Sequence, residues 1–233
     1  MAPINIPILC TRPLPATLID EAMQEGLTIE VLSFIETESI LSVEVQQEIE
    51  QASLKSSIVV FTSMNAVDAV TNFLDGHKPD WTIYSLGATT QKLIGDYFGG
   101  ERIAGTANDA AALAALITKQ AVAGEVIFFC GDQRREELPA ILKQHSIDVQ
   151  EIIVYQTIAT PHKINKGYHG ILFFSPSAVD SFFSVNKIPE STILFAIGNT
   201  TANEIKKHTN NKINISAAPG KENLVHKMME FFS

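Results

Sequence analysis

Short apolar runs alternate along the chain with segments whose apolar residues recur every three or four positions. The apolar runs predict strands at residues 6–10, 58–61, 82–86, 126–130, 171–174 and 193–197, and two weaker runs, 102–104 and 213–216, predict short edge strands. The segments between them have helical spacing, for example Ala66, Val67, Val70 and Leu74. Because each run is continuously apolar, its strand is expected to be covered on both faces. The pattern predicts an α/β fold with parallel sheets.

The sequence also contains an internal repeat. Residues 60–68 (VFTSMNAVD) return as 172–180 (LFFSPSAVD), and residues 86–90 (LGATT) return as 197–201 (IGNTT), in the same order. A third pair is displaced: residues 8–10, a helical stretch and residues 28–37 parallel residues 128–130, a helical stretch and residues 147–157. One copy is therefore continuous and the other is split, so we expect the chain to leave one domain, build a second and return.

These patterns set the expected domain boundaries. We expect a discontinuous first domain of residues 1–33 and 160–233, a second domain of residues 38–152, and hinge strands at 34–37 and 153–159. The extended runs 30–36 and 150–158 hold equivalent places in the repeat, so they are predicted to pair as a two-stranded antiparallel linker.

Charge and composition limit the possible partners. The 233 residues carry 17 Lys and Arg against 26 Asp and Glu, a net charge of −9, and no basic run, which argues against a nucleic-acid or anionic-membrane partner. The N-terminus lacks signal-peptide features and the apolar stretches are too short to span a bilayer. Cys10 and Cys130 have no CxxC spacing and are expected to be reduced core thiols. We therefore expect a cytoplasmic protein, and a monomer because no exposed apolar stripe is evident.

Small hydroxyl residues and glycines follow the predicted strands, at the places where helices are expected to begin. They are Thr62 and Ser63, Gly87 with Thr89 and Thr90, Gly131 with Asp132, Ser175 to Ser177, and Gly198 with Thr200 and Thr201. Ligands of parallel α/β folds bind at these strand ends, and the free N–H groups of a helix start bind anions without arginine. Each residue taken alone is more simply an N-cap. Their recurrence in both halves favours two facing domains that line an anion-binding cleft.

The remaining candidates stand outside known motifs. There is no GxGxxG, Walker-type, HExxH or GxSxG sequence, and the six histidines show no ligand spacing. Arg12 precedes Pro13 in a predicted first helical turn; for Arg12 and Arg135, substrate contact and a surface salt bridge both stay open, whereas Arg134 is expected at the surface. Tyr155 lies on a predicted hinge strand, where spacing alone favours packing, although its protonated phenol is a possible general acid.

Several of these segments resemble the uroporphyrinogen-III synthase family. The most recognisable are residues 129–139 (FCGDQRREELP) and 154–157 (VYQT), and residues 61–67, 173–177 and 196–202 fit the same family in the same order. The resemblance covers essentially the whole chain. It implies two similar flavodoxin-like domains with parallel sheets, joined by a two-stranded antiparallel linker.

The resemblance also implies a reaction. The substrate would be hydroxymethylbilane, a linear tetrapyrrole with eight carboxylates, which loses water and closes into a ring with inversion of its last pyrrole through a spiro intermediate, without metal or cofactor. Tyr155 matches the tyrosine that helps the hydroxyl leave, and Thr62, Ser63, Thr90, Ser175 and Thr201 match positions that line the cleft. In two places the chain departs from the family: Pro219-Gly220 stands where relatives often have Pro-Thr, and Gln91 follows Thr90 where a small residue is usual.

The combined prediction is a catalytic Tyr155 and a substrate-binding set. The set comprises Arg12, Thr62, Ser63, Gly87, Thr90, Arg135, Ser175, Ser177, Gly198, Thr200, Thr201 and Gly220, with no metal ligand among them. Two rival functions fit the sequence less well. A two-domain small-molecule binding protein has similar topology but is usually exported, and a nucleotide-sugar transferase would need larger domains and a glycine fingerprint.

Overall fold

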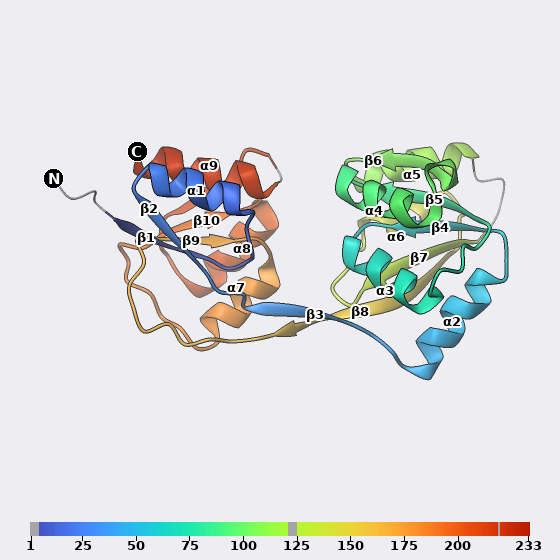
Figure 1. Ribbon diagram of the computed structural model, residues 1–233, viewed down its shortest axis with the longest axis horizontal. Coiled ribbons are helices and arrows are strands. Elements are labelled where there is room, and N and C mark those ends of the chain that lie inside the picture. The colour runs from blue at the N-terminus through green and yellow to red at the C-terminus, as the bar shows by residue number, and fades with distance from the viewer. Residues whose placement is uncertain (1–4, 121–124, 219) are drawn as a thin grey trace. The chain divides into compact units, whose positions relative to one another are not determined.

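The computed structural model describes residues 5–120, 125–218 and 220–233. The chain divides into two compact units. Unit 1 comprises Met1–Glu36 and Ile158–Ser233, and unit 2 comprises Thr37–Thr157. In Figure 1, unit 1 therefore contains the dark blue and the orange to red segments, and unit 2 contains the cyan to yellow segments.

Unit 1 is built on a five-stranded sheet with the order β11-β10-β9-β1-β2. Its strands are β1 (Ile6–Cys10), β2 (Leu27–Val31), β9 (Gly170–Phe173), β10 (Ile193–Ala196) and β11 (Ile213–Ile215), and each pair of neighbours is parallel. One face packs against α1 (Ala16–Gln24) and α9 (Lys221–Phe232), and the other against α7 (Pro176–Phe183) and α8 (Asn199–His208) (Figure 1).

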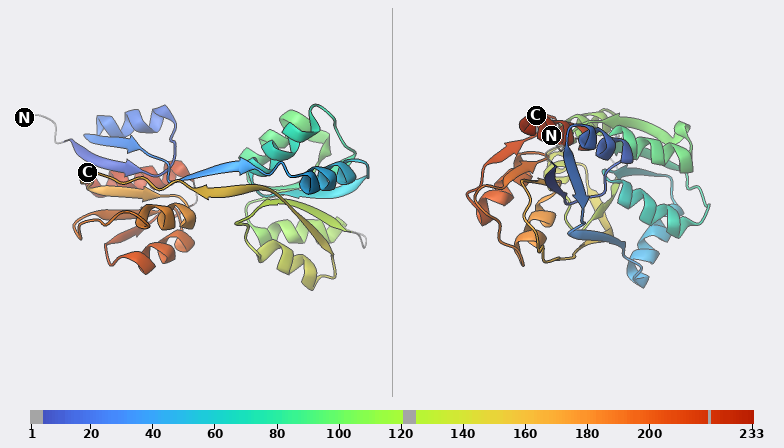
Figure 2. Two further views of the ribbon diagram at one scale, coloured as in Figure 1. Left: turned by 90° about the horizontal axis from the view of Figure 1, so that it is seen from below. Right: turned by 60° about the vertical axis from the view of Figure 1, so that its left-hand side comes forward.

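Unit 2 repeats this architecture. Its parallel strands are β4 (Ser57–Phe61), β5 (Trp81–Leu86), β6 (Ile103–Ala107), β7 (Val126–Gly131) and β8 (Val149–Ala159), in a sheet with the order β3-β8-β7-β4-β5-β6. One face is covered by α2 (Val43–Ser53), α3 (Met64–Leu74) and α4 (Ala88–Phe98), which is followed by a short 3₁₀ turn, η1 (Gly100–Arg102); the other is covered by α5 (Ala110–Gln120) and α6 (Glu137–Gln144). Figure 2 shows helices on both faces of each sheet.

The two sheets have the same spatial order with different chain connections. The order β2-β1-β9-β10-β11 matches β8-β7-β4-β5-β6, and both are the flavodoxin-like order 2-1-3-4-5. In unit 1 the strands at positions 1 to 5 follow one another along the chain as β1, β2, β9, β10 and β11. In unit 2 the strands at positions 1 and 2 are β7 and β8, and they come last in the chain. Unit 2 is therefore a circular permutation of unit 1, which explains why the third repeated segment is displaced. The predicted α/β fold with parallel sheets is confirmed.

The linker strand β3 (Ile35–Ser39) lies beside β8. Within unit 1 the N–H of Thr160 donates to the carbonyl of Phe34 at 2.9 Å, and within unit 2 the N–H of Ile40 donates to the carbonyl of Val154, also at 2.9 Å. The partner's number falls as the residue number rises, so the two strands run antiparallel. The predicted two-stranded linker is thus present, although the 30–36 run is divided between the end of β2 and the start of β3.

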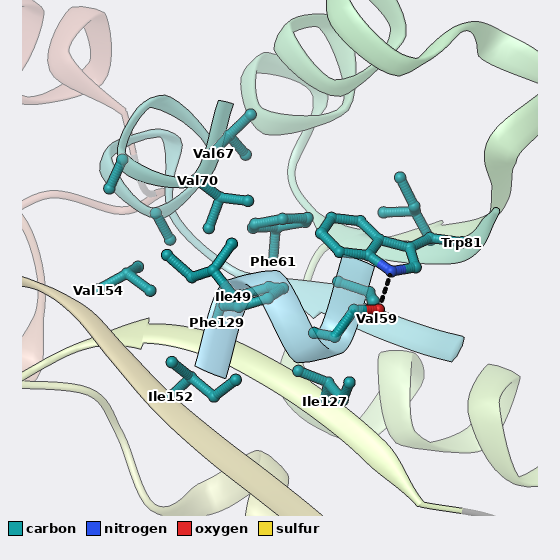
Figure 3. Close-up of a cluster of buried hydrophobic side chains, with 14 of the residues drawn as sticks. Ile49, Val59, Phe61, Val67, Val70, Trp81, Ile127, Phe129, Ile152 and Val154 are labelled. Atoms are coloured by element: carbon teal, nitrogen blue, oxygen red, sulfur yellow. Dashed lines mark hydrogen bonds between the residues drawn. The ribbon is translucent and has the colours of Figure 1, made fainter. Parts of the chain in front are cut away.

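Large apolar side chains fill both faces of each sheet. In unit 2 the rings of Phe61, Trp81 and Phe129 pack together beneath α2 and α3 (Figure 3). Trp81 is 1% exposed, and its indole N–H donates to the carbonyl of Ala52 at 2.9 Å, so the polar atom of this ring is satisfied inside the core. None of the helices in the described ranges is long and apolar enough to cross a membrane.

One local prediction is wrong. The helix expected to begin at Arg12–Pro13 begins at Ala16, with Pro15 as its N-cap at φ −55° and ψ 141°. A residue that precedes proline is sterically pushed out of the helical region, and both Arg12 and Leu14 precede a proline. Arg12 therefore lies in the loop between β1 and α1 rather than in a helical turn.

Candidate functional site

The carboxyl ends of the parallel strands lead into helices that begin in two different ways. In the first, a serine caps the helix: Ser63 Oγ accepts the N–H of Asn65 at 3.2 Å at the start of α3, and Ser175 Oγ accepts the N–H of Ala178 at 3.2 Å at the start of α7. Ser177 Oγ lies 3.2 Å from Ser175 Oγ. Each cap satisfies one N–H group of the first helical turn and leaves the others available.

In the second way, a glycine precedes the helix and offers no side-chain acceptor. Gly87, Gly198 and Gly220 hold this place before α4, α8 and α9. Gly87 and Gly220 have φ values of 77° and 127°, a region that residues with a Cβ rarely adopt. The N–H of Gly87 donates to the carbonyl of Ala107 at 2.9 Å, so the free donors of α4 begin at Ala88. These three helix starts combine free N–H groups with the positive end of a helix dipole, the usual elements of an anion site.

The predicted hydroxyl residues differ in exposure. Thr62, Ser63, Ser175 and Ser177 are half-buried and Thr200 is exposed. Thr90 and Thr201, the third residues of α4 and α8, are only 6% and 3% exposed. The exposed threonines of these first turns are Thr89 and Thr200. A ligand at α4 or α8 would therefore meet Thr89 or Thr200 before the side chains of Thr90 or Thr201.

Tyr155 reaches the point where β7 and β4 lie side by side. The register between β7 and β8 shifts at Gly131, which places Tyr155 opposite that glycine, and a Cβ added there would lie 2.4 Å from the ring of Tyr155. The hydroxyl donates to Ser63 Oγ at 3.1 Å. In the order 2-1-3-4-5, β7 and β4 hold positions 1 and 3. The boundary between these two positions is the topological switch point, where parallel α/β folds bind ligands. A bulge and a missing side chain thus place a phenol at the ligand-binding edge of unit 2.

Asp132 fixes the backbone around this tyrosine. Its N–H donates to the carbonyl of Tyr155 at 3.1 Å, and its carboxylate accepts the N–H of Thr157 at 2.9 Å. The two bonds hold β8 on both sides of Gln156. The sequence analysis names Gly131 and Asp132 among the residues at strand ends but does not include them in the predicted substrate-binding set. The available signal was the glycine itself, which follows Cys130 where the repeat has Thr11 after Cys10.

A second residue that sequence reasoning missed is Lys221, the first residue of α9. Its Nζ donates to the carbonyl of Pro13 at 2.9 Å, next to Arg12. Partial burial and then the charge of Arg12 lower the pKa of Lys221 below its ordinary value. Across the described ranges, no ion pair involves Arg12 or Lys221. A lysine beside another cation at the positive end of a helix is electrostatically unfavourable without an anion. The sequence alone gives no signal for this conflict, because Lys221 and Arg12 meet only in the folded unit.

The two remaining arginines and the two cysteines have different environments. Arg134 pairs with Glu151 and, at 3.0 Å, with Glu136, so its charge is used within unit 2. Arg135 is exposed and forms none of the ion pairs found among the described residues. Burial raises the pKa of Cys10 to about 12 and that of Cys130 to about 11, which keeps both as thiols rather than nucleophilic thiolates. Pro219 lies outside the described residues.

The structure is similar to uroporphyrinogen-III synthetase from Helicobacter pylori 26695, with a TM-score of 0.70 and 17% identity over 97% of this chain and 99% of that one. It is also similar to a mutant uroporphyrinogen III synthase from the extremely thermophilic bacterium Thermus thermophilus, with a TM-score of 0.64 and 13% identity over 97% of each chain. Comparison with curated proteins returns no match.

At these identities the structural likeness establishes the fold. The family is established by sequence: a model of the family described as uroporphyrinogen-III synthase HemD matches residues 16–226. This chain therefore belongs to the uroporphyrinogen-III synthase family.

Proposed function

We propose that this protein is the enzyme of tetrapyrrole and haem biosynthesis that closes hydroxymethylbilane into uroporphyrinogen III, with loss of water and inversion of ring D. Family membership supports the reaction class. The single observation on this chain that carries the proposal is the hydrogen bond of 3.1 Å from the Tyr155 hydroxyl to Ser63 Oγ at the switch point of unit 2.

Tyr155 would act as the general acid. A phenol is protonated at neutral pH, and the leaving hydroxyl of the substrate needs a proton to depart as water. Departure leaves a resonance-stabilised azafulvenium cation. The proton is replaced when the pyrrole carbon that closes the ring loses its hydrogen, so Tyr155 ends the cycle as it began it. The contact with Gly131 holds the ring in one orientation, and the O–H, which donates to Ser63 in the structure, would turn to the leaving hydroxyl for this transfer.

The substrate's carboxylates would be held chiefly by helix starts. We assign the backbone donors to the glycine-capped helices that follow Gly87, Gly198 and Gly220, and cationic contacts to Arg12, Lys221 and Arg135. The hydroxyls of Thr62, Ser63, Ser175, Ser177 and Thr200 would add side-chain contacts. Thr90 and Thr201, whose side chains are almost fully buried, would contribute through their main-chain N–H groups in the same first turns. This scheme explains how a chain of net charge −9 binds a polyanion, because the attraction is local and directed.

Positioning would determine which isomer forms. Unaided closure of the reactive substrate gives the un-inverted type I isomer, so the enzyme has to favour attack by the substituted carbon of the last ring. Carboxylates held at several helix starts would restrain the substrate, and this restraint contributes most to catalysis when it matches the geometry of the spiro transition state. In this proposal the chemistry itself needs no metal or cofactor.

We also propose that the enzyme works as a cytoplasmic monomer, without a nucleic-acid or membrane partner. Two free, buried cysteines suit a reducing compartment, and the net charge of −9 disfavours anionic partners. Light scattering of the purified protein at micromolar concentration should give the mass of one chain, 25.5 kDa. A dimer mass at that concentration would contradict the monomer.

The activity is tested by anaerobic incubation of purified protein with hydroxymethylbilane, followed by chromatographic separation of the type I and type III isomers. The expected result is rapid formation of type III. Type I alone, at the rate of the buffer control, would exclude the enzyme. Saturable binding of the substrate without turnover would identify a tetrapyrrole-binding protein instead.

A further inference from the structure

Three potential metal ligands meet on the helical face of unit 1 formed by α7 and α8. They are Asp180 of α7 with Glu204 and His208 of α8, and one ligand atom from each lies within 4.8 Å of the other two. His208 Nε2 is 2.8 Å from Asp180 Oδ1 and 4.0 Å from Glu204 Oε1. Glu204 and His208 are four residues apart, so they project from the same side of α8. No part of the proposed reaction uses this cluster.

We propose that Asp180, Glu204 and His208 bind a first-row divalent cation, with Zn²⁺ as the best match. With bonds of about 2.0–2.1 Å, the ligand atoms of a tetrahedral zinc ion are about 3.3 Å apart. The distances of 2.8 and 4.0 Å bracket that value, and all three ligand atoms lie within 4.8 Å of one another, a spacing close to that of a zinc site. One imidazole nitrogen with two carboxylates suits Zn²⁺ better than Mg²⁺ or Ca²⁺, which prefer oxygen ligands throughout.

The imidazole is already held in place. The ring of Phe183 stacks on that of His208 with centroids 5.1 Å apart and an interplanar angle of 5°. Phe183 also stacks on Phe173, a residue of β9 that is 0% exposed. The plane of the histidine is thus tied to the core of unit 1, which lowers the entropy lost when a cation binds. The side chains of His208 and Asp180 are 30% and 57% exposed, so the ion can reach them from solvent.

Lys207 offers a way to test the proposed metal site. Its Nζ pairs with Glu204 Oε2 at 2.8 Å, which leaves Oε1, the oxygen nearer His208, for the ion. The positive charge beside the site opposes cation binding. If the cluster serves only as an ion pair between α7 and α8, removing Lys207 has no reason to create affinity for a metal. If it is a cation site, the Lys207→Gln variant binds the metal more tightly.

The experiment titrates untagged, metal-stripped protein with Zn²⁺ by calorimetry, repeats the titration with Ca²⁺, and follows Co²⁺ by its visible absorption. We expect one Zn²⁺ per chain with a micromolar dissociation constant, a rise in the thermal midpoint on addition of Zn²⁺, and no response to Ca²⁺. His208→Gln and Asp180→Asn should each weaken Zn²⁺ binding by about tenfold or more, because each removes a ligand. Lys207→Gln should tighten binding severalfold.

The matched control is His226→Gln. His226 Nε2 lies 3.2 Å from Glu21 Oε2 in an exposed pair that belongs to no three-residue cluster among the described residues, so its loss should leave Zn²⁺ affinity unchanged. The proposal is overturned if His208→Gln and Asp180→Asn both bind Zn²⁺ like the wild type, or if Ca²⁺ binds equally well. Circular dichroism of each variant verifies that its fold is retained, and Asp180→Asn keeps an oxygen that still accepts from His208.

Discussion

The two units share one strand order but differ at their switch points. In unit 2 the edge between β7 and β4 carries the Tyr155 hydroxyl, bonded to Ser63 at 3.1 Å. In unit 1 the edge between β1 and β9 is closed by Thr11, whose hydroxyl donates to the carbonyl of Leu172 at 2.8 Å. The aromatic residue that follows β2 there is Phe34, which is 0% exposed and packs against Phe182 in the core. The duplicated fold therefore presents a proton donor at the switch point of unit 2.

The two units also differ in the charge at the start of the helix that follows the edge strand. In unit 2, the carboxylate of Asp109 accepts the N–H of Ala112 at 2.8 Å, so the start of α5 already has an anion. In unit 1, the start of α9 has Gly220 and Lys221 instead, close to Arg12. Two similar scaffolds thus differ by single residues at strand ends: in the proposed scheme unit 2 would supply the acid, and unit 1 would supply the cationic site for a carboxylate.

The largest expected effect comes from Tyr155→Phe. Removal of a general acid typically costs a factor of about 100 or more, so kcat should fall by about 100-fold while KM changes little. The ring and its packing remain, and the stability of unit 2 should be nearly unchanged. Steady-state kinetics with hydroxymethylbilane measures the effect. A variant with the full wild-type rate would remove the proton-donor role and leave the fold and the binding scheme intact.

Gly131→Ala should come next. Its Cβ would lie 2.4 Å from the Tyr155 ring, so the ring has to move, and such overpacking costs about 1–3 kcal/mol of unfolding free energy. We expect this variant to unfold at a lower denaturant concentration and to have a reduced kcat. Gly167→Ala is the matched control, since no atom lies within 4 Å of its added Cβ. Equal denaturation midpoints for the two variants would show that Gly131 does not position Tyr155.

Lys221→Gln tests the anion site of unit 1. Loss of one charge-assisted contact should raise KM by about tenfold, equivalent to about 1.4 kcal/mol, with kcat largely retained. Lys227→Gln removes the same charge from the same helix, where Lys227 pairs with Glu230 at 3.4 Å, and should leave KM unchanged. If both variants raise KM equally, the effect is general electrostatics rather than a local site.

The smallest effect compares the two serine caps. Ser63→Ala and Ser175→Ala should each lower the unfolding free energy by about 1 kcal/mol, because each leaves one N–H of a helix start without its cap. Only Ser63→Ala should also lower kcat, since Ser63 holds the Tyr155 hydroxyl. Thermal unfolding and kinetics of both variants separate these outcomes. A matching fall of kcat in Ser175→Ala would contradict the asymmetry.

Much of the fold could be predicted because apolar runs and repeated segments can be recognised in the sequence itself. Continuous apolar runs and the displaced repeat predicted the strands and the interrupted domain. The position of Pro13 predicts a helical turn at Arg12–Pro13, but Leu14 also precedes a proline, and the helix begins only after Pro15. The burial of Thr90 and Thr201 depends on how α4 and α8 rotate against their sheets, and spacing alone does not fix that rotation.

The site was less predictable because its contacts are remote in sequence. The bond from Tyr155 to Ser63 joins residues 92 positions apart, and the space for the ring depends on a bulge at Gly131. Spacing alone therefore favoured packing for Tyr155, and the resemblance to the family supplied its role. Lys221 was overlooked because a single lysine after a glycine is normally a solvated surface charge, and its proximity to Arg12 arises only when the two ends of the chain fold together.

The central proposal is that main-chain N–H groups at helix starts bind the carboxylates of a tetrapyrrole. It is tested most directly by titrating ¹⁵N-labelled protein with uroporphyrinogen III under anaerobic conditions and following each amide by NMR. The account predicts shifts in the first turns of α4, α8 and α9, including Thr89, Thr200 and Lys221, that saturate together at one ligand per chain. Shifts absent from these turns would contradict it.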